Sequence, residues 1–104
     1  MNTTIRPADA RYALSNLPDW TFQEDGGGSI SREYRFSNFV KAFEFMRQMA
    51  DYSEKIQHHP EWSNVYQRVS VRLTTHDAGG LTSRDLQWAI QADQVATSLT
   101  GSAD

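Results

Sequence analysis

The sequence predicts an α+β domain, a four-stranded antiparallel sheet with helices packed on one face, in the order α-β-β-α-β-β-α. Two pairs of short segments alternate apolar and polar residues, which is typical of strands that bury one face. Between and after these pairs lie two long segments, residues 38–57 and 83–99, with apolar residues at helical spacing. The 104 residues suffice for one core, so we expect a single domain over residues 1–104.

The N-terminal part of the chain is expected to form a helix and a hairpin. Residues 7–17 begin with a proline, which suits a first helical turn, and Pro18 follows them. Strands over residues 20–23 and 30–36 flank the glycine run Gly26–Gly28. A glycine run suits either a phosphate-binding loop or a turn. The turn is favoured here, because the next segment is a strand and not a helix.

Residues 38–57 form the clearest predicted helix, with Ser37 as the expected N-cap. Their apolar residues make two neighbouring stripes, which together cover about half of the helical circumference. We expect both stripes to pack on the sheet. The first contains Phe39, Phe43, Met46 and Ala50, and the second contains Ala42, Phe45, Met49, Tyr52 and Ile56.

Two further strands and a last helix complete the predicted domain. Residues 62–66 and 68–75 are the predicted strands, and in the second of them valine and leucine alternate with polar residues. A loop that contains glycine leads to the helix over residues 83–99. Thr82 and Asp85 at its start resemble a capping box, in which the side chain of each residue accepts a hydrogen bond from the backbone N–H of the other.

The last helix carries apolar residues on two faces, although a surface helix of a monomer needs only one. One face, Leu86, Ala89 and Ile90, is expected to pack on the sheet. The other is a candidate subunit interface, and consists of Trp88, Ala92, Val95 and Leu99. The sequence therefore predicts a homodimer or a homotetramer.

Composition excludes several kinds of site. The chain has no cysteine, so disulfides, thiolate nucleophiles and zinc–thiolate sites are excluded within it. The net charge of −3 argues against direct binding of nucleic acid, and no apolar run is long enough to span a membrane. Residues 1–10 lack the apolar core of a signal peptide, so a cytoplasmic protein is expected.

The candidate catalytic residues are the three histidines, His58, His59 and His76. Histidine can donate or accept a proton near neutral pH. Pro60 takes His59 out of helical geometry, and strand alternation places His76 on the accessible face, so the three imidazoles can converge. The spacing of the histidines alone leaves two other interpretations open. The histidines can be separate surface or helix-capping residues, or they can bind a metal ion together with water, although no HExxH spacing occurs.

Four runs of residues surround these histidines. Residues 36–46 read FSNFVKAFEFM, residues 54–66 read EKIQHHPEWSNVY, residues 69–76 read VSVRLTTH, and residues 79–82 read GGLT. In order and spacing, these runs resemble the pterin-4a-carbinolamine dehydratase family. The resemblance covers nearly the whole chain after residue 10, and HHPEW followed by TH is its most specific part.

The resemblance implies a dehydratase that removes water from 4a-hydroxytetrahydrobiopterin, or a related tetrahydropterin, and releases a quinonoid dihydropterin. It implies catalysis by His58, His59 and His76 without a metal or another cofactor. The implied substrate-binding residues are Gln57, His58, His59, Thr74, Thr75, His76 and Asp77. The implied supporting residues are Glu54, Pro60, Trp62, Arg84 and Asp85.

The resemblance also implies a physiological setting. It implies that the protein recycles tetrahydropterin for aromatic amino acid hydroxylases and assembles into dimers or tetramers. An alternative function is protein binding, because vertebrate relatives act as dimerisation cofactors of a homeodomain transcription factor. Gln57 departs from those relatives that carry an acid before the histidine pair, which removes one negative charge near His58.

Overall fold

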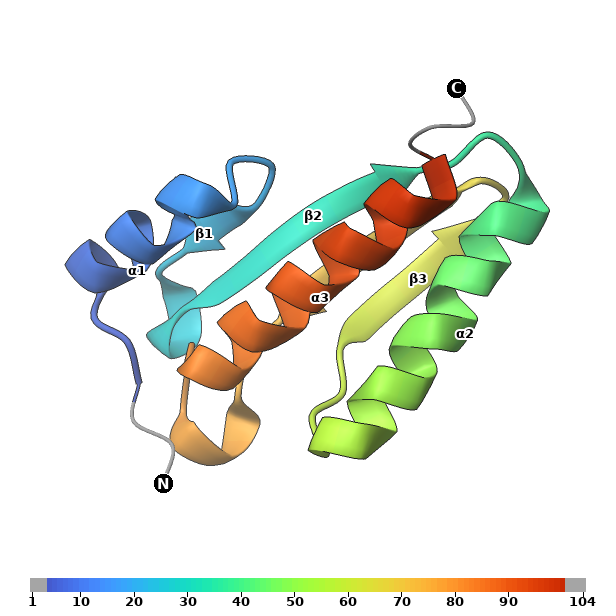
Figure 1. Ribbon diagram of the computed structural model, residues 1–104. Coiled ribbons are helices and arrows are strands. Elements are labelled where there is room, and N and C mark those ends of the chain that lie inside the picture. The colour runs from blue at the N-terminus through green and yellow to red at the C-terminus, as the bar shows by residue number, and fades with distance from the viewer. Residues whose placement is uncertain (1–3, 101–104) are drawn as a thin grey trace.

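The computed structural model describes residues 4–100 and has the predicted order of helices and strands (Figure 1). The helices are α1 (Pro7–Ala13), α2 (Phe39–Ile56) and α3 (Ser83–Thr100). The strands are β1 (Thr21–Gln23), β2 (Ser29–Arg35), β3 (Glu61–Val65) and β4 (Arg68–Leu73). Short 3₁₀ turns lie at Leu14–Asn16, Asp25–Gly27 and His76–Ala78.

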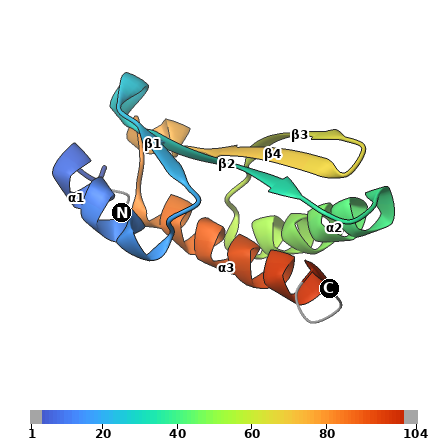
Figure 2. The same cartoon turned by 90° about the horizontal axis from the view of Figure 1, so that it is seen from above.

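The four strands form one antiparallel sheet in the order β1-β2-β4-β3. All three helices lie on the same face of this sheet and leave the other face open (Figure 2). Ile30 pairs with Leu73, and Trp62 pairs with Val71, so apolar residues of neighbouring strands share the face that the helices cover. The predicted α+β fold is therefore confirmed.

The core lies between the sheet and the helices α2 and α3. Its largest fully buried apolar side chains are Trp88, Phe45, Ile30, Met49 and Leu73. The indole N–H of Trp88 donates to Ser53 Oγ at 2.8 Å, so this buried polar group is paired. The core holds both helices on the sheet, and this fixes where α2 ends and where α3 begins.

The first helix ends earlier than predicted. α1 stops at Ala13, and a 3₁₀ turn over Leu14–Asn16 replaces the last α-helical turn expected up to Leu17. Residues three apart lie on the same side of a 3₁₀ helix. Leu14 begins this turn and Leu17 follows it, and both are buried in the core.

The N-cap of α2 is Asn38 and not Ser37, because Asn38 Oδ1 accepts from the Lys41 N–H at 2.9 Å. Of the two predicted stripes of α2, the second supplies the fully buried Ala42, Phe45 and Met49, and the first contributes only the partly buried Met46. Phe39 and Phe43 are 46% and 57% exposed, and their predicted burial is wrong. Since α3 lies beside α2 and covers the rest of the sheet, α2 packs inward with the other stripe (Figure 1).

The face of α3 predicted to contact a second subunit is part of the core. Trp88 and Ala92 are fully buried and Val95 is nearly so, whereas Ile90 is 49% exposed. The prediction of a subunit interface on this face is therefore wrong. Helical periodicity identifies two apolar stripes, but it does not tell which of them meets the sheet.

The glycine run forms the predicted turn between β1 and β2. It also contacts the loop that follows β4, since a Cβ added to Gly27 would lie 1.8 Å from the carbonyl oxygen of Gly79. The Leu81 N–H donates to the carbonyl oxygen of Gly27 at 3.2 Å. The β1–β2 turn thus supports the loop on which part of the candidate site lies. No helix within residues 4–100 has the length and apolar character that a membrane crossing requires.

Candidate active site

The three histidines meet at one end of the sheet, where α2 ends, β4 runs into a 3₁₀ turn and α3 begins (Figure 1). There they line a hollow of about 220 Å³. The lining residues are Gln57, His58, His59, Thr74, Thr75, His76, Asp77 and Arg84. Every residue predicted to bind substrate therefore lines one hollow, together with one residue of the predicted supporting set.

The end of α2 sends the two adjacent histidines in different directions. Gln57 has left-handed backbone angles, φ 55° and ψ 48°, and the Ser53 carbonyl oxygen accepts from the N–H groups of Gln57 and His58. The His58 side chain turns into the protein and is buried, whereas that of His59 stays exposed. This local turn makes one histidine a buried wall of the hollow and the other its rim.

A buried carboxylate holds His58. His58 Nε2 lies 2.6 Å from Asp85 Oδ1, and the Asp85 side chain is fully buried. The other carboxylate oxygen accepts from Thr75 Oγ1 and from the Thr82 N–H, each at 2.9 Å. Because the Thr75 hydroxyl proton goes to Asp85, the Thr82 hydroxyl must donate to Thr75 across 2.7 Å. Asp85 is therefore both the capping residue of α3 and the partner of His58.

A carboxylate in the last turn of α2 holds His59. His59 Nε2 lies 2.6 Å from Glu54 Oε2, and both side chains are more than half exposed. An exposed pair of this kind adds little to stability. It restrains the orientation of the His59 ring at the rim of the hollow.

His76 pairs with a residue that the sequence prediction missed. His76 Nε2 lies 2.9 Å from Glu61 Oε2, and Arg72 donates to the other oxygen, Oε1, at 2.9 Å. These contacts lower the pKa of Glu61, the bond to His76 being the largest cause and the bond to Arg72 the next. Glu61 belongs to the HHPEW run, but only the pairing of β3 with β4 sets it opposite Arg72 and within reach of His76.

Arg84 joins the start of α3 to the end of α2. Its Nη2 donates to the carbonyl oxygen of Ile56 at 2.7 Å and also to that of Gln57. The last carbonyl groups of a helix carry partial negative charge, which a guanidinium offsets. Arg84 thereby fixes the histidine pair relative to α3 and to Asp85.

Thr74 and Thr75 shape the loop after β4. Thr74 Oγ1 donates to the Gly28 carbonyl oxygen at 2.9 Å. The Thr75 N–H donates to the Gly80 carbonyl oxygen at 2.9 Å, and the Thr75 carbonyl accepts from three N–H groups of the same loop. The polar groups of Thr75 are thus used inside the protein, and this residue forms the wall of the hollow.

Pro60 and Trp62 lie outside the hollow. Pro60 connects the histidine pair to β3. Trp62 is half-buried and packs against the core, with its ring centroid 6.0 Å from that of Trp88. Trp62 therefore packs beneath β3 and does not line the histidine hollow.

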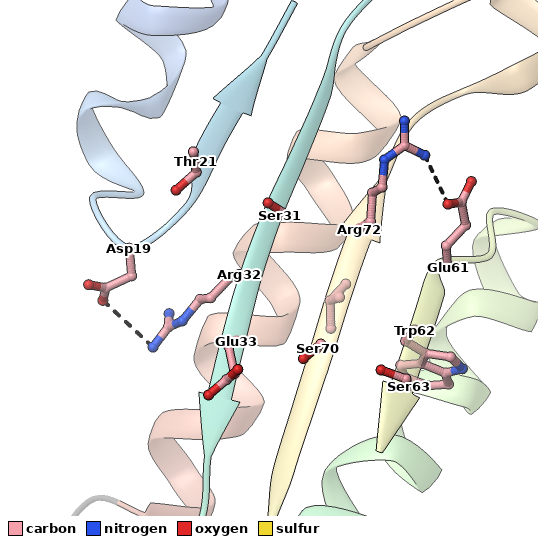
Figure 3. A pocket seen from close by; sticks show the side chains of 11 residues that line it. Asp19, Thr21, Ser31, Arg32, Glu33, Glu61, Trp62, Ser63, Ser70 and Arg72 are labelled. Carbon is pink, nitrogen blue, oxygen red and sulfur yellow. Dashed lines mark hydrogen bonds and ion pairs between the residues drawn. The ribbon is translucent and has the colours of Figure 1, made fainter. Parts of the chain in front are cut away.

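A larger hollow, of about 580 Å³, lies on the open face of the sheet (Figure 3). Four of its charged side chains form two pairs, since Arg32 lies 3.6 Å from Asp19 and Arg72 lies 2.9 Å from Glu61. None of its lining residues is a histidine. We take the smaller hollow as the candidate active site, because three imidazole side chains share one space there.

The histidine site suits proton transfer. A carboxylate that accepts from Nε2–H keeps the proton on that nitrogen and leaves the lone pair of a neutral ring on Nδ1. A neutral ring can accept a proton there, and a protonated ring can donate one. Residues 4–100 contain no cluster of three or more His, Asp or Glu side chains arranged to hold a metal ion. Fold and site together define a small α+β protein in which three histidines line one hollow.

The chain belongs to the pterin 4 alpha carbinolamine dehydratase family, whose sequence profile matches residues 3–95. A protein of Rhizorhabdus wittichii, with the provisional name pterin-4-alpha-carbinolamine dehydratase, is 52% identical over 84 residues, which are 81% of this chain and 86% of that protein. A protein of Novosphingobium aromaticivorans with the same provisional name is 53% identical, over 84% of this chain and 92% of its own length. The family predicted from the motifs is confirmed.

Two solved structures are similar in fold. The transcriptional coactivator/pterin dehydratase from Brucella melitensis matches with a TM-score of 0.86 and 37% identity, over 90% of this chain and 99% of that chain. A pterin dehydratase-like protein, described as a RuBisCO assembly factor in the alpha-carboxysome, matches with a TM-score of 0.65 and 19% identity, over 75% of this chain and 89% of that chain. At that identity the second likeness shows the fold alone.

Proposed function

We propose that the protein is a 4a-hydroxytetrahydropterin dehydratase, which removes water from the pterin carbinolamine and releases a quinonoid dihydropterin. The family and the names of the relatives support a pterin dehydratase. The observation that carries the proposal is the meeting of His58, His59 and His76 in one hollow, each ring bonded to its own carboxylate.

The reaction needs one proton delivered and one proton removed. The 4a-hydroxyl leaves as water after it receives a proton, and the N5 proton is lost as the C4a–N5 double bond forms. Two histidines in opposite protonation states supply both transfers. One carbinolamine gives one dihydropterin and one water, and no electrons are exchanged with the protein.

We assign the two proton transfers to His58 and His76, and the positioning of the substrate to His59. His58 is buried, lines the hollow and contacts Asp85 through Nε2, so its ring is held in one orientation. His59 lies at the exposed rim, where it can close against the ring of the substrate. Gln57, Thr74, Thr75 and Asp77 line the rest of the proposed pterin site.

The decay of the carbinolamine, followed by ultraviolet absorbance with and without the protein, tests this activity. His58→Ala and His76→Ala should each lower the rate by about two orders of magnitude or more, the weight of a positioned acid or base. Circular dichroism should show that both variants remain folded. Exhaustive chelation should leave the wild-type rate unchanged. Near-full activity in both single variants would rule out the three-histidine site.

We place this reaction in the cytoplasmic recycling of tetrahydropterin, with residues 1–104 acting as one domain. The chemistry of the substrate supports this setting, because aromatic amino acid hydroxylases release the 4a-carbinolamine. An aromatic amino acid hydroxylase assay with limiting tetrahydropterin is the corresponding test. Added protein should raise product yield, and His76→Ala should not.

A second candidate function is binding to another protein as a transcriptional coactivator. The Brucella melitensis relative is described as both a coactivator and a pterin dehydratase. In addition, Phe39, Val40 and Phe43 form an exposed apolar surface on α2, with Val40 74% exposed. A pull-down with a candidate transcription factor separates the two functions, since His58→Ala should retain binding and Val40→Glu should retain dehydration.

We further propose that the protein forms a homodimer or homotetramer, with contacts on α2 in place of the α3 face predicted from the sequence. The exposed residues Phe39, Val40 and Phe43 lie within one turn or so of each other, and a two-fold pair of such helices would cover them. β3 is an edge strand and offers a second contact. Sedimentation at micromolar concentration tests assembly, and a wild-type monomer would contradict it.

A further inference from the structure

Glu61 lies between the two hollows of the molecule and contributes to both. It lines the hollow on the open face of the sheet, and its Oε2 contacts His76, which lines the histidine hollow. Its Oε1 accepts from Arg72 Nη1, a contact drawn in Figure 3. Because the Glu61 side chain is about half exposed, these two contacts, and not burial, hold it in place.

We infer that Glu61 is a positioning residue for His76: it keeps the ring proton on Nε2 and so presents Nδ1 as the nitrogen that exchanges a proton with the substrate. The contact between Glu61 and His76 does not depend on the proposed function, but the consequence of this contact for catalysis rests on the proposed function.

The contact with Arg72 determines which atom donates and which accepts in the hydrogen bond between Glu61 and His76. A guanidinium only donates hydrogen bonds, so Oε1 of Glu61 must accept. The two donors keep Glu61 ionised by lowering its pKa, and an ionised carboxylate also only accepts at Oε2. His76 can bond to Oε2 only through an Nε2–H, and the lone pair of the neutral ring is then on Nδ1.

The fold brings the partners together from separate segments. Glu61 opens β3 directly after Pro60, where the chain leaves the histidine pair. The antiparallel pairing of β3 with β4 sets Glu61 opposite Arg72, and the chain reaches His76 just beyond the end of β4. The segment that carries His58 and His59 therefore also supplies the partner of the third histidine.

Glu61→Gln tests the inference, because the change keeps the size of the side chain and Arg72 still requires an oxygen. The amide NH₂ should then face His76 and donate to Nε2, which forces the ring proton onto Nδ1. We expect the ¹⁵N chemical shifts of the neutral His76 ring to change from the Nε2–H to the Nδ1–H pattern. In the dehydration assay, kcat should fall about tenfold and KM should change less than about twofold.

Two variants complete the experiment. Glu61→Asp keeps the charge and should restore the wild-type tautomer and part of kcat. Glu33→Gln is the matched control, because Glu33 lines the same open face but pairs with Arg35 and Arg68. It should match the wild type in both measurements.

The outcomes separate the two claims. An unchanged His76 tautomer in Glu61→Gln, or a reversed tautomer with full kcat, would overturn the positioning role. A wild-type protein that does not accelerate dehydration would instead contradict the proposed function, and the tautomer measurement would still test how Glu61 holds His76.

Discussion

Asp85 and Asp93 lie on the same helix, α3, and both accept hydrogen bonds from side chains outside that helix, but their partners differ in kind. Asp85 holds the imidazole of His58, which lines the histidine hollow. Asp93 holds an indole, a guanidinium and a phenol, those of Trp20, Arg32 and Tyr34. Burial and the bond to Asp93 raise the pKa of Tyr34 far above its usual range, so this phenol stays protonated in neutral solution.

The two carboxylates also use their oxygens differently. Asp85 accepts on both, from His58 on Oδ1 and from two other donors on Oδ2. Asp93 accepts all three side-chain bonds on Oδ1. Both residues anchor α3, but His58 shares a hollow with two further histidines. Under the proposed function, the difference between the two carboxylates therefore lies in the partner that each one orients.

Asp85→Asn is expected to have the largest effect on activity. The amide oxygen can keep the bonds from Thr75 and Thr82, so the NH₂ group faces His58 and donates to Nε2. His58 must then carry its proton on Nδ1, which is the nitrogen proposed to exchange a proton with the substrate. The dehydration rate should fall by about three orders of magnitude. Absorbance kinetics measures the rate, and the His58 ¹⁵N shifts report the tautomer; a reversed tautomer with a full rate would contradict this role.

Gly27→Ala should displace the loop that carries Thr75, which donates to Asp85. The contacts of Asp93 should stay unchanged. Gly27 has φ 89°, and the added Cβ would meet the Gly79 carbonyl oxygen. The left-handed backbone and the displaced loop together should lower the free energy of unfolding by about 3 kcal/mol. Urea denaturation measures this loss. Gly26→Ala is the matched control at φ 64° with no atom within 4 Å of its Cβ, and it should lose only about 1 kcal/mol; equal losses would exclude the loop contact as the cause.

Asp93→Asn should weaken the fold moderately and spare the chemistry. Its amide oxygen can still accept the bonds that Oδ1 accepts, and only the charge of the pair with Arg32 is lost. We expect a loss of about 1–2 kcal/mol in unfolding free energy and an unchanged rate per folded molecule. Denaturation and absorbance kinetics on the same sample give both values. A tenfold or greater loss of rate would mean that the two carboxylates are coupled along α3.

The smallest effect is expected at Glu44, a partly exposed carboxylate of α2. Hydrogen bonds from Arg47 and Gln48 lower the pKa of Glu44 from 4.5 to about 2. Because the folded pKa lies below the unfolded one, the contribution of this group to stability is complete above pH 4.5 and is lost as the pH falls towards 2. Glu44→Gln should therefore reduce the stability lost between about pH 6 and about pH 3, by less than Asp93→Asn changes stability. Urea midpoints of the wild type and the variant at both pH values measure these losses. A larger loss of stability at acid pH in the variant than in the wild type would contradict the prediction.

Local patterns in the chain were enough to predict most of the fold and the place of the site. Alternation over residues 68–75 identified β4, and Val69, Val71 and Leu73 are buried as this alternation requires. The HHPEW and TH runs identified the segments that form the histidine hollow. Such predictions succeed because the side-chain period of a strand or helix is a property of consecutive residues.

Two features depended on contacts between distant segments. Helical spacing shows two apolar stripes on both α2 and α3, yet Phe43 is exposed and Trp88 is buried, because burial depends on which face the sheet and the neighbouring helix occupy. Likewise, the motif contains Glu61, but its bond to His76 exists only because β3 pairs with β4 in one register. The chain therefore encodes its periods and its reactive residues locally, whereas long-range packing selects the inward face of each helix and the partner of each histidine.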